Sequence, residues 1–97
     1  MAFKVIITSP AQNDIFKALD WYESKQSGLG KRFYMDYNDV ISYLKTNPEL
    51  FSIKSGDFRE AKIAGFPYVV IYEINIDTLI VYAVFNTYLN PNKKPGK

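Results

Sequence analysis

Apolar residues recur along this chain with two different periods, and each period predicts one kind of secondary structure. Over residues 3–8 every second side chain is apolar, which predicts a short strand with Phe3, Val5 and Ile7 on one face. Over residues 11–22 and 29–44, apolar side chains return every three or four positions, which predicts two amphipathic helices. Because their connection is short and contains glycine, we expect them to pack as an antiparallel hairpin.

Local signals mark where each helix begins and ends. Ser9 is a suitable N-cap, Pro10 suits the first helical position, and Asp14 falls in the early turns, where the helix dipole favours a carboxylate. Glycines at positions 28 and 30 allow the reversed backbone of a tight connection. The second helix should end at Asn47-Pro48, because proline disfavours helical geometry in the residue before it.

Three further strands are expected after the helices, over residues 58–63, 66–74 and 79–85, where β-branched and aromatic residues are concentrated. Their links are short, so they should form an antiparallel meander with the apolar stretch 68–74 as its central strand. The residues between the second helix and this meander should form a loop, 49–56, whose Leu50 and Phe51 close the end of the helical hairpin.

Together these elements predict an α+β fold in the order strand–helix–helix–three strands, with the helical hairpin on one face of a small, mainly antiparallel sheet. The other face is expected to be half polar and lined by Arg59, Tyr68, Tyr72 and Tyr82. A chain of 97 residues has room for a single core. We therefore expect one domain over residues 1–91 and a short basic tail over 92–97.

The composition removes several kinds of chemistry. The chain has no cysteine and no histidine, which excludes a disulfide framework, a thiolate metal site and a histidine general base. We expect no metal and no cofactor, so any catalysis would have to use Tyr, Lys, Arg or carboxylates. No apolar run approaches the ~20 residues of a membrane helix, and the first residues lack the pattern of a signal peptide. We therefore expect a cytoplasmic protein without a membrane segment.

The net charge of +2 is concentrated at the C-terminus. Residues 1–85 carry nine basic and ten acidic side chains, whereas the last twelve residues carry Lys93, Lys94 and Lys97 and no acid. Such a tail is either solvated or in contact with nucleic acid or an acidic partner.

Short motifs follow one another in a characteristic order and spacing over nearly the whole chain. They are Ala11, Asp14 and Ile15, then Trp21-Tyr22-Glu23, Gly28-Leu29-Gly30 with Phe33, Asn47-Pro48-Glu49-Leu50-Phe51, Arg59, Phe66-Pro67-Tyr68-Val69-Val70-Ile71-Tyr72-Glu73, and Ala83-Val84-Phe85-Asn86-Thr87-Tyr88-Leu89-Asn90-Pro91. In these motifs the chain resembles the RelE/ParE superfamily of toxins from bacterial type II toxin–antitoxin modules.

The resemblance implies the fold predicted above and a cognate antitoxin that wraps the toxin and neutralises it. The sequence leaves open whether the chain forms a homodimer or a toxin–antitoxin hetero-oligomer. It also implies one of two targets. RelE-like members bind in the ribosome and cleave messenger RNA, and ParE-like members poison DNA gyrase.

The sequence departs from the ribonuclease branch of this superfamily. Ribonuclease members place Arg, Lys, His or Tyr at the centre of the sheet and the exit of its last strand, where these groups transfer protons and stabilise phosphorane charge. Here the centre is Val69-Val70-Ile71, Asn86 stands where a His is expected, and Tyr88 or Leu89 stands where an Arg is expected. An unassisted tyrosine, with its pKa of ~10, is a poor base at neutral pH.

The candidate catalytic residues are therefore reduced to Arg59 and Tyr88. We favour a ParE-like toxin that acts by binding a target such as DNA gyrase. A ribosome-dependent endoribonuclease and a weak or inactive plasmid-stabilisation module remain the alternatives.

The candidate binding residues form two groups. The target-binding group lies at the exit of the last strand and in the tail: Asn86, Thr87, Tyr88, Lys93 and Lys94. The antitoxin-binding group consists of aromatics partly off the core stripes, expected beside a groove between hairpin and sheet: Phe16, Trp21, Tyr34 and Tyr43. Simpler structural roles compete with these: a cross-strand pair from Arg59 to Glu60 or Glu73, packing of Trp21 and Tyr22 within the hairpin, and a turn at Asn86-Thr87.

Overall fold

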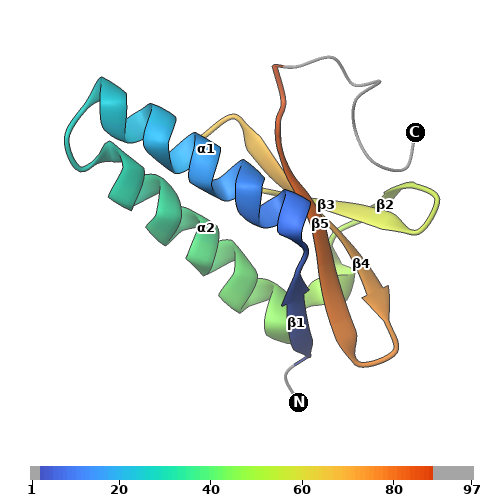
Figure 1. Ribbon diagram of the computed structural model, residues 1–97. Coiled ribbons are helices and arrows are strands. Elements are labelled where there is room, and N and C mark those ends of the chain that lie inside the picture. Colours follow the sequence, from blue (N-terminus) through green and yellow to red (C-terminus); the bar gives the residue numbers. More distant parts are fainter. Residues whose placement is uncertain (1–2, 89–97) are drawn as a thin grey trace.

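A computed structural model describes residues 3–88, which form a helical hairpin on one face of a five-stranded mixed sheet (Figure 1). The elements, in chain order, are β1 (Lys4–Ile7), α1 (Ser9–Lys25), α2 (Leu29–Thr46), the 3₁₀ turn η1 (Pro48–Leu50), β2 (Ile53–Ser55), β3 (Phe58–Lys62), β4 (Tyr68–Asn75) and β5 (Thr78–Asn86). The strand order is β1-β5-β4-β3-β2, with β1 parallel to β5 and every other pair antiparallel. The predicted α+β class, the meander and the central position of β4 are confirmed.

The chain enters α1 one residue earlier than the sequence predicts. Thr8, not Ser9, is the N-cap, with φ −66° and ψ 159°. Its Oγ1 accepts the N–H of Ala11 at 3.4 Å and donates to the carbonyl of Val81 at 2.9 Å. Thr8 therefore caps the helix and also fastens the helix start to β5, a double role that Ser9, already helical, cannot fill.

The carboxylate of Glu23 closes the helical hairpin by accepting hydrogen bonds from the backbone at the start of α2. Glu23 accepts the N–H groups of Gly28 and Gly30 at 3.0–3.1 Å. Gly28 has φ +88°, a conformation that glycine adopts without strain. At Gly30 a Cβ would lie 2.7 Å from the carbonyl oxygen of Leu19. Both predicted glycine positions are thus required, one for backbone conformation and one for the close approach of the two helices.

The main core lies between the hairpin and the sheet. Tyr37, Ile41 and Leu44 of α2 share it with Val70 and Tyr72 of β4, and Val40 and Ile74 pack at its margin. The Tyr72 hydroxyl donates to the carbonyl of Pro48 at 2.6 Å, which satisfies the buried phenol. The predicted apposition of α2 and the central strand is confirmed.

The segment after α2 differs from the predicted loop. It contains η1 and the short edge strand β2, which is paired with β3. Phe51 packs against the core as expected, but Leu50 is 66% exposed. The prediction for Leu50 was wrong because the 3₁₀ turn directs only one of these two neighbours inward.

The outer face of the sheet is more apolar than predicted. Arg59 is paired with Tyr72 and lies on the helix-covered side with it, and Tyr68 also packs against the main core. Of the four residues expected outside, Tyr82 is found there: its ring contacts Phe58 and its hydroxyl donates to Glu73 at 2.9 Å. The centre of this face is a small cluster of Val69, Ile71 and Ala83, flanked by Phe58 and Phe85. No helix within residues 3–88 is long and apolar enough to cross a membrane.

Truncation of Leu44 tests the position of the core. Leu44 is fully buried, so Leu44→Ala should lower the free energy of unfolding by ~2–5 kcal/mol, out of the ~5–15 kcal/mol typical of such domains. Met35→Ala, at a position 55% exposed on the same helix, is the matched control and should stay within about 0.5 kcal/mol of the parent. Urea unfolding followed by circular dichroism measures both. Equal losses in the two variants would mean that the buried face of α2 is wrongly assigned.

Candidate functional site

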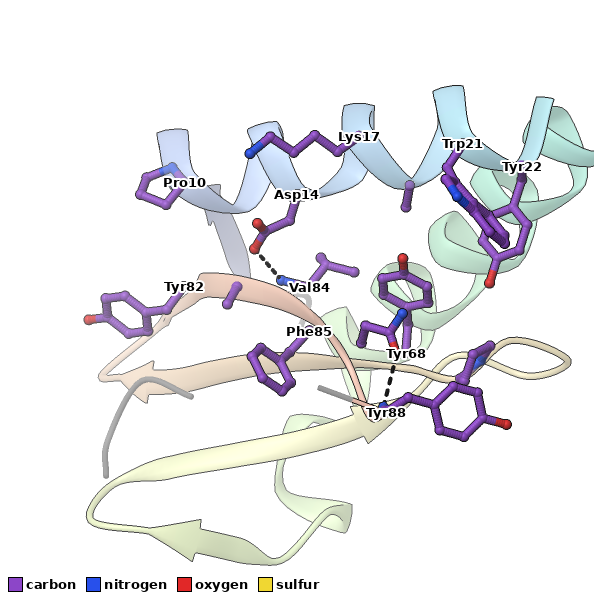
Figure 2. A pocket seen from close by; sticks show the side chains of 14 residues that line it. Pro10, Asp14, Lys17, Trp21, Tyr22, Tyr68, Tyr82, Val84, Phe85 and Tyr88 are labelled. Carbon is purple, nitrogen blue, oxygen red and sulfur yellow. Dashed lines mark hydrogen bonds between the residues drawn. The ribbon is translucent and has the colours of Figure 1, made fainter. Parts of the chain in front are cut away.

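A recess of about 750 Å³ lies between α1 and the C-terminal half of β5 (Figure 2). One wall is formed by α1, which presents Pro10, Asp14, Lys17 and Trp21. The floor is β5 from Tyr82 to Asn86, and Tyr68 and Tyr88 line the end near the strand exit. The recess therefore combines a helix wall, a strand edge and the residues that follow the last strand.

The recess exists because β1 is shorter than the strand it accompanies. β1 has four residues and pairs with β5 over Thr78 to Val81, whereas β5 has nine residues and continues to Asn86. The chain turns into α1 at Thr8, whose side chain donates to the carbonyls of Val81 and, at 3.3 Å, Tyr82. Beyond that point the edge of β5 is accompanied by a helix, which cannot complete the backbone ladder.

Asp14 provides a polar link across the recess. Its carboxylate points from α1 to β5 (Figure 2) and accepts the N–H of Val84 at 3.0 Å. Desolvation raises the pKa of Asp14 above its ordinary value of 3.8, although the hydrogen bond from Val84 and the charge of Lys17 act in the opposite direction. Asp14 lies in the second turn of α1, among the early turns where the sequence places it, and the first turn contains no acidic residue.

The closed end of the recess is aromatic. Tyr22 packs edge-on against Phe66 with ring centroids 4.8 Å apart and lies 6.2 Å from Tyr68. Trp21 meets Tyr22 edge-on at 5.0 Å and carries the Lys25 ammonium 5.0 Å above its ring. Burial raises the pKa of the Tyr22 phenol, which therefore stays protonated at physiological pH. Tyr22 thus packs within the hairpin, whereas Trp21 remains 55% exposed beside the recess.

The two candidate catalytic residues are not brought together. The guanidinium of Arg59 donates to the carbonyls of Phe51 at 2.5 Å and Glu49 at 3.4 Å, and so holds the segment after α2. Tyr88 lies two residues beyond Asn86, which is paired with Tyr68, whereas Arg59 is paired with Tyr72. Four residues along β4 correspond to about 13 Å. The backbone carbonyls of Glu49 and Phe51 thus hold the Arg59 guanidinium in this position.

The candidate target-binding residues lie partly in the recess. Asn86 and Tyr88 line it, and Asn86 Oδ1 accepts the N–H of Tyr88 at 2.9 Å. Thr87 instead returns to Pro67, with its N–H at 2.8 Å and its hydroxyl at 3.1 Å from that carbonyl. The turn expected at this exit is therefore present. Lys93 and Lys94, like the rest of the predicted tail, lie outside the described residues.

The four aromatics predicted to bind an antitoxin are all exposed, but they do not share one groove. Phe16 is 58%, Tyr34 43% and Tyr43 49% exposed. Only Trp21 lines the recess, and Tyr43 lines a separate hollow with Phe51 and Lys62. Of these four aromatics, Trp21 is therefore the one that lines the same recess as the exit of the last strand.

Sequence reasoning did not assign Asp14 and Lys17 to the recess, although a signal was present. Besides the buried Ala18 and Tyr22, the positions of α1 that line the recess are 10, 14, 17 and 21. Each of these four lies one residue before a buried position of the same helix: Ala11, Ile15, Ala18 and Tyr22. Side chains in a stripe next to the buried stripe of a helix lie where that helix meets the edge of a sheet. Within residues 3–88, no three acidic side chains are grouped so that they could hold a metal ion.

Comparison with known proteins identifies a matching family and a matching fold. The family model for the ParE toxin of the type II toxin–antitoxin system parDE matches residues 5–87. A structure of the chromosomal ParDE toxin–antitoxin system from P. aeruginosa has the same fold, with a TM-score of 0.75 at 11% sequence identity, over 88% of this chain and 96% of that chain. A search of curated protein sequences finds no match.

Replacement of Asp14 tests the polar link between α1 and β5. Asp14→Ala leaves the Val84 N–H without its acceptor and should cost about 1–3 kcal/mol of unfolding free energy. Asp14→Asn retains an acceptor oxygen and should cost less. Urea unfolding at pH 7 measures both, and an Asp14→Ala variant as stable as the parent would show that the link contributes nothing.

The same carboxylate predicts a pH dependence. Because the pKa of Asp14 is raised in the folded state, the folded chain holds this proton more tightly than the unfolded chain. The part of the stability that is linked to this proton is therefore fully present below the unfolded pKa of Asp14 and is lost as pH rises through its folded pKa, whereas the hydrogen bond from Val84 is retained. In Asp14→Asn that decline should disappear. Unfolding free energies measured between pH 3.5 and 7 as a difference between variant and parent test the sign, and a difference that does not change with pH would contradict it.

Proposed function

Since this chain belongs to the ParE family of toxins from type II toxin–antitoxin systems, we propose that it inhibits DNA gyrase by binding and that a cognate antitoxin neutralises it. The binding surface comprises the strand exit and the tail, Asn86, Thr87, Tyr88, Lys93 and Lys94. Toxin and antitoxin form a hetero-oligomer in the cytoplasm. No cofactor or metal takes part.

The placement of Arg59 is the observation that carries a binding mechanism rather than a ribonuclease mechanism. The chain has two arginines, and Arg59 is engaged with backbone carbonyls on the helix-covered side of the sheet. The outer face has Val69, Ile71 and Ala83 at its centre, and hydrocarbon side chains cannot stabilise a developing phosphorane. Catalysis of RNA cleavage requires cations and proton-transfer groups together, and Arg59 and Tyr88 are far apart.

The tyrosines of the described domain are also poorly suited to proton transfer. Burial raises the pKa of Tyr37 and of Tyr72 to about 12. The hydrogen bond to Glu73 raises the pKa of Tyr82. A general base functions best when its pKa lies near the working pH, so these phenols stay protonated. Binding needs no such group.

The recess provides a route to neutralisation. Trp21, from the predicted antitoxin-binding group, lies there with Asn86 and Tyr88 from the predicted target-binding group. A partner that buries Trp21 therefore also covers the strand exit. We infer that the antitoxin blocks the toxin by occupying the surface that the target needs.

Two substitutions distinguish binding from chemistry. Lys93→Glu with Lys94→Glu reverses the tail charge and should abolish growth inhibition when the toxin is expressed without antitoxin, because attraction to an acidic or DNA-bound target is lost. Tyr88→Phe retains the aromatic ring and should leave most of the growth inhibition. Growth curves after induction, at matched protein levels, measure both.

The opposite result has a defined meaning. If Tyr88→Phe abolishes growth inhibition while the lysine changes have little effect, the chain acts as an endoribonuclease. If the parent chain does not inhibit growth at all, it is an inert plasmid-stabilisation module, and the toxin proposal fails.

The antitoxin surface is tested with two aromatic truncations. Trp21→Ala should weaken binding of the antitoxin encoded beside this gene by at least about tenfold, because exposed tryptophans that become buried are frequent hot spots. Tyr34→Ala removes an exposed aromatic of α2 that does not line the recess and serves as the comparison. Calorimetry gives both affinities, and a larger loss for Tyr34→Ala would move the antitoxin to the outer face of the hairpin.

A further inference from the structure

The turn between β4 and β5 holds a residue in a conformation that its side chain disfavours. Asn75 and Thr78 are paired across the two strands, so the turn has two central residues, Ile76 and Asp77. Ile76 has φ +58°, and within residues 3–88 it is the one residue other than glycine with a positive φ. For a β-branched side chain this conformation is an outlier, because the Cβ atom comes too close to a backbone carbonyl oxygen.

The other turns of the described chain avoid such strain. Gly28, Gly56 and Gly65 occupy the remaining positions of residues 3–88 that have a positive φ. A two-residue hairpin turn whose first central residue alone has a positive φ normally places glycine there as well. The isoleucine at position 76 therefore departs from the residue type that the backbone of this turn favours.

Packing within the described chain gives no reason for this isoleucine. Its side chain is 91% exposed, the largest exposed fraction among the large apolar side chains of residues 3–88. A side chain without hydrogen-bonding groups gains stability by leaving water, and here it stays in water. A strained backbone is characteristic of binding sites, where it holds a side chain ready for a partner.

The surrounding strands hold the turn in this conformation. The N–H of Lys4, in β1, donates to the carbonyl of Asp77 at 3.0 Å. The hydroxyl of Thr78 donates to the Asp77 carboxylate at 3.2 Å. The tip is therefore fixed by β1 as well as by β4 and β5, and Ile76 is presented without the loss of freedom that a mobile loop would suffer on binding.

The position of the tip indicates which partner it meets. It lies at the end of β5 opposite to the strand exit (Figure 1), and the length of β5 from Thr78 to Asn86 corresponds to about 26 Å. The recess, where the antitoxin is expected, begins only at Tyr82. A standard protein interface of about 800 Å² per partner is about 30 Å across, so one target surface can reach both the strand exit and the tip.

The outer face of the sheet offers apolar surface between these two ends. Ile6 is 52% exposed and is paired with Ile80. Its neighbours Val5 and Ile7 pack against the main core, so the side chain of Ile6 lies on the outer face. Ile6 extends the apolar surface from the tip toward the centre of that face.

We propose that Ile76 is an anchor that inserts into an apolar pocket of the target protein, so that DNA gyrase is held at both ends of β5. This inference rests on the proposed function and adds a contact residue to it. An aliphatic side chain makes no hydrogen bond to a base or a phosphate, and the adjacent Asp77 carboxylate repels phosphate, so the occupant is protein rather than nucleic acid. A hydrogen-bond donor at the rim of that pocket would meet the same carboxylate.

Replacement of Ile76 by glycine separates the anchor from the fold. Ile76→Gly should melt no lower than the parent, because relief of strain offsets the greater freedom of glycine in the unfolded chain. Inhibition of gyrase supercoiling should nevertheless require at least about tenfold more of this variant. Ile76→Val keeps a branched aliphatic side chain and should retain most of the inhibition. Met35→Ala, at a position 55% exposed on α2, is the control and should inhibit like the parent.

Calorimetry with the antitoxin encoded beside this gene, and sedimentation of the isolated chain, distinguish the other possible occupants. Ile76→Gly should bind the antitoxin as tightly as the parent does. A loss of antitoxin affinity without a loss of gyrase inhibition would assign the tip to the antitoxin. Self-association of the parent that Ile76→Gly abolishes would assign it to a second copy. Either result overturns the proposal.

Two further results have defined meanings. If Ile76→Gly inhibits gyrase as well as the parent, or melts well below it, Ile76 is not an anchor for the target, while the toxin proposal stays intact. A parent chain that does not inhibit gyrase at all would overturn the proposed function together with this inference.

Discussion

The difference in length between β1 and β5 is the constraint on which the functional surface depends. A four-residue strand accompanies a nine-residue strand, so about half of one β5 edge must find partners elsewhere. Thr8 provides hydrogen-bond partners where the chain leaves β1 and enters α1. Asp14 provides one further partner along the helix. Because buried backbone groups are costly to leave unpaired, these two side chains fix where α1 crosses the sheet. The recess is the space left between a helix and a strand edge that diverge.

A large part of the domain's stability comes from the core beneath the second helix. The main core joins α2 to β4, and Tyr72 and Arg59 extend it by holding the carbonyls of the segment after α2. An arginine and a tyrosine in paired positions of a sheet could have served phosphate chemistry. Here they are used to anchor a connection. Arg59 and Tyr72 therefore serve structure, at a distance from the strand exit.

Much of the fold could be predicted from the sequence because its main signals are periodic. The helix stripes, the glycines of the hairpin and the apolar run of β4 each belong to one element and were interpreted correctly. The errors occurred where a residue depends on a distant part of the chain. Asp14 and Thr8 bond to β5 some seventy residues away, and the inward turn of Arg59 depends on carbonyls in the segment after α2. The recess was missed for the same reason, since it depends on the unequal lengths of two strands that are distant in sequence.

The central claim is that this chain is a toxin that acts by binding DNA gyrase, with no chemical step of its own. The most direct measurement is DNA supercoiling by purified gyrase in the presence of increasing amounts of the purified chain, beside a translation reaction with ribosomes and messenger RNA. The account predicts that supercoiling is inhibited and that the antitoxin restores it, while the messenger RNA stays intact. Cleavage of the messenger RNA on the ribosome with gyrase unaffected would contradict it.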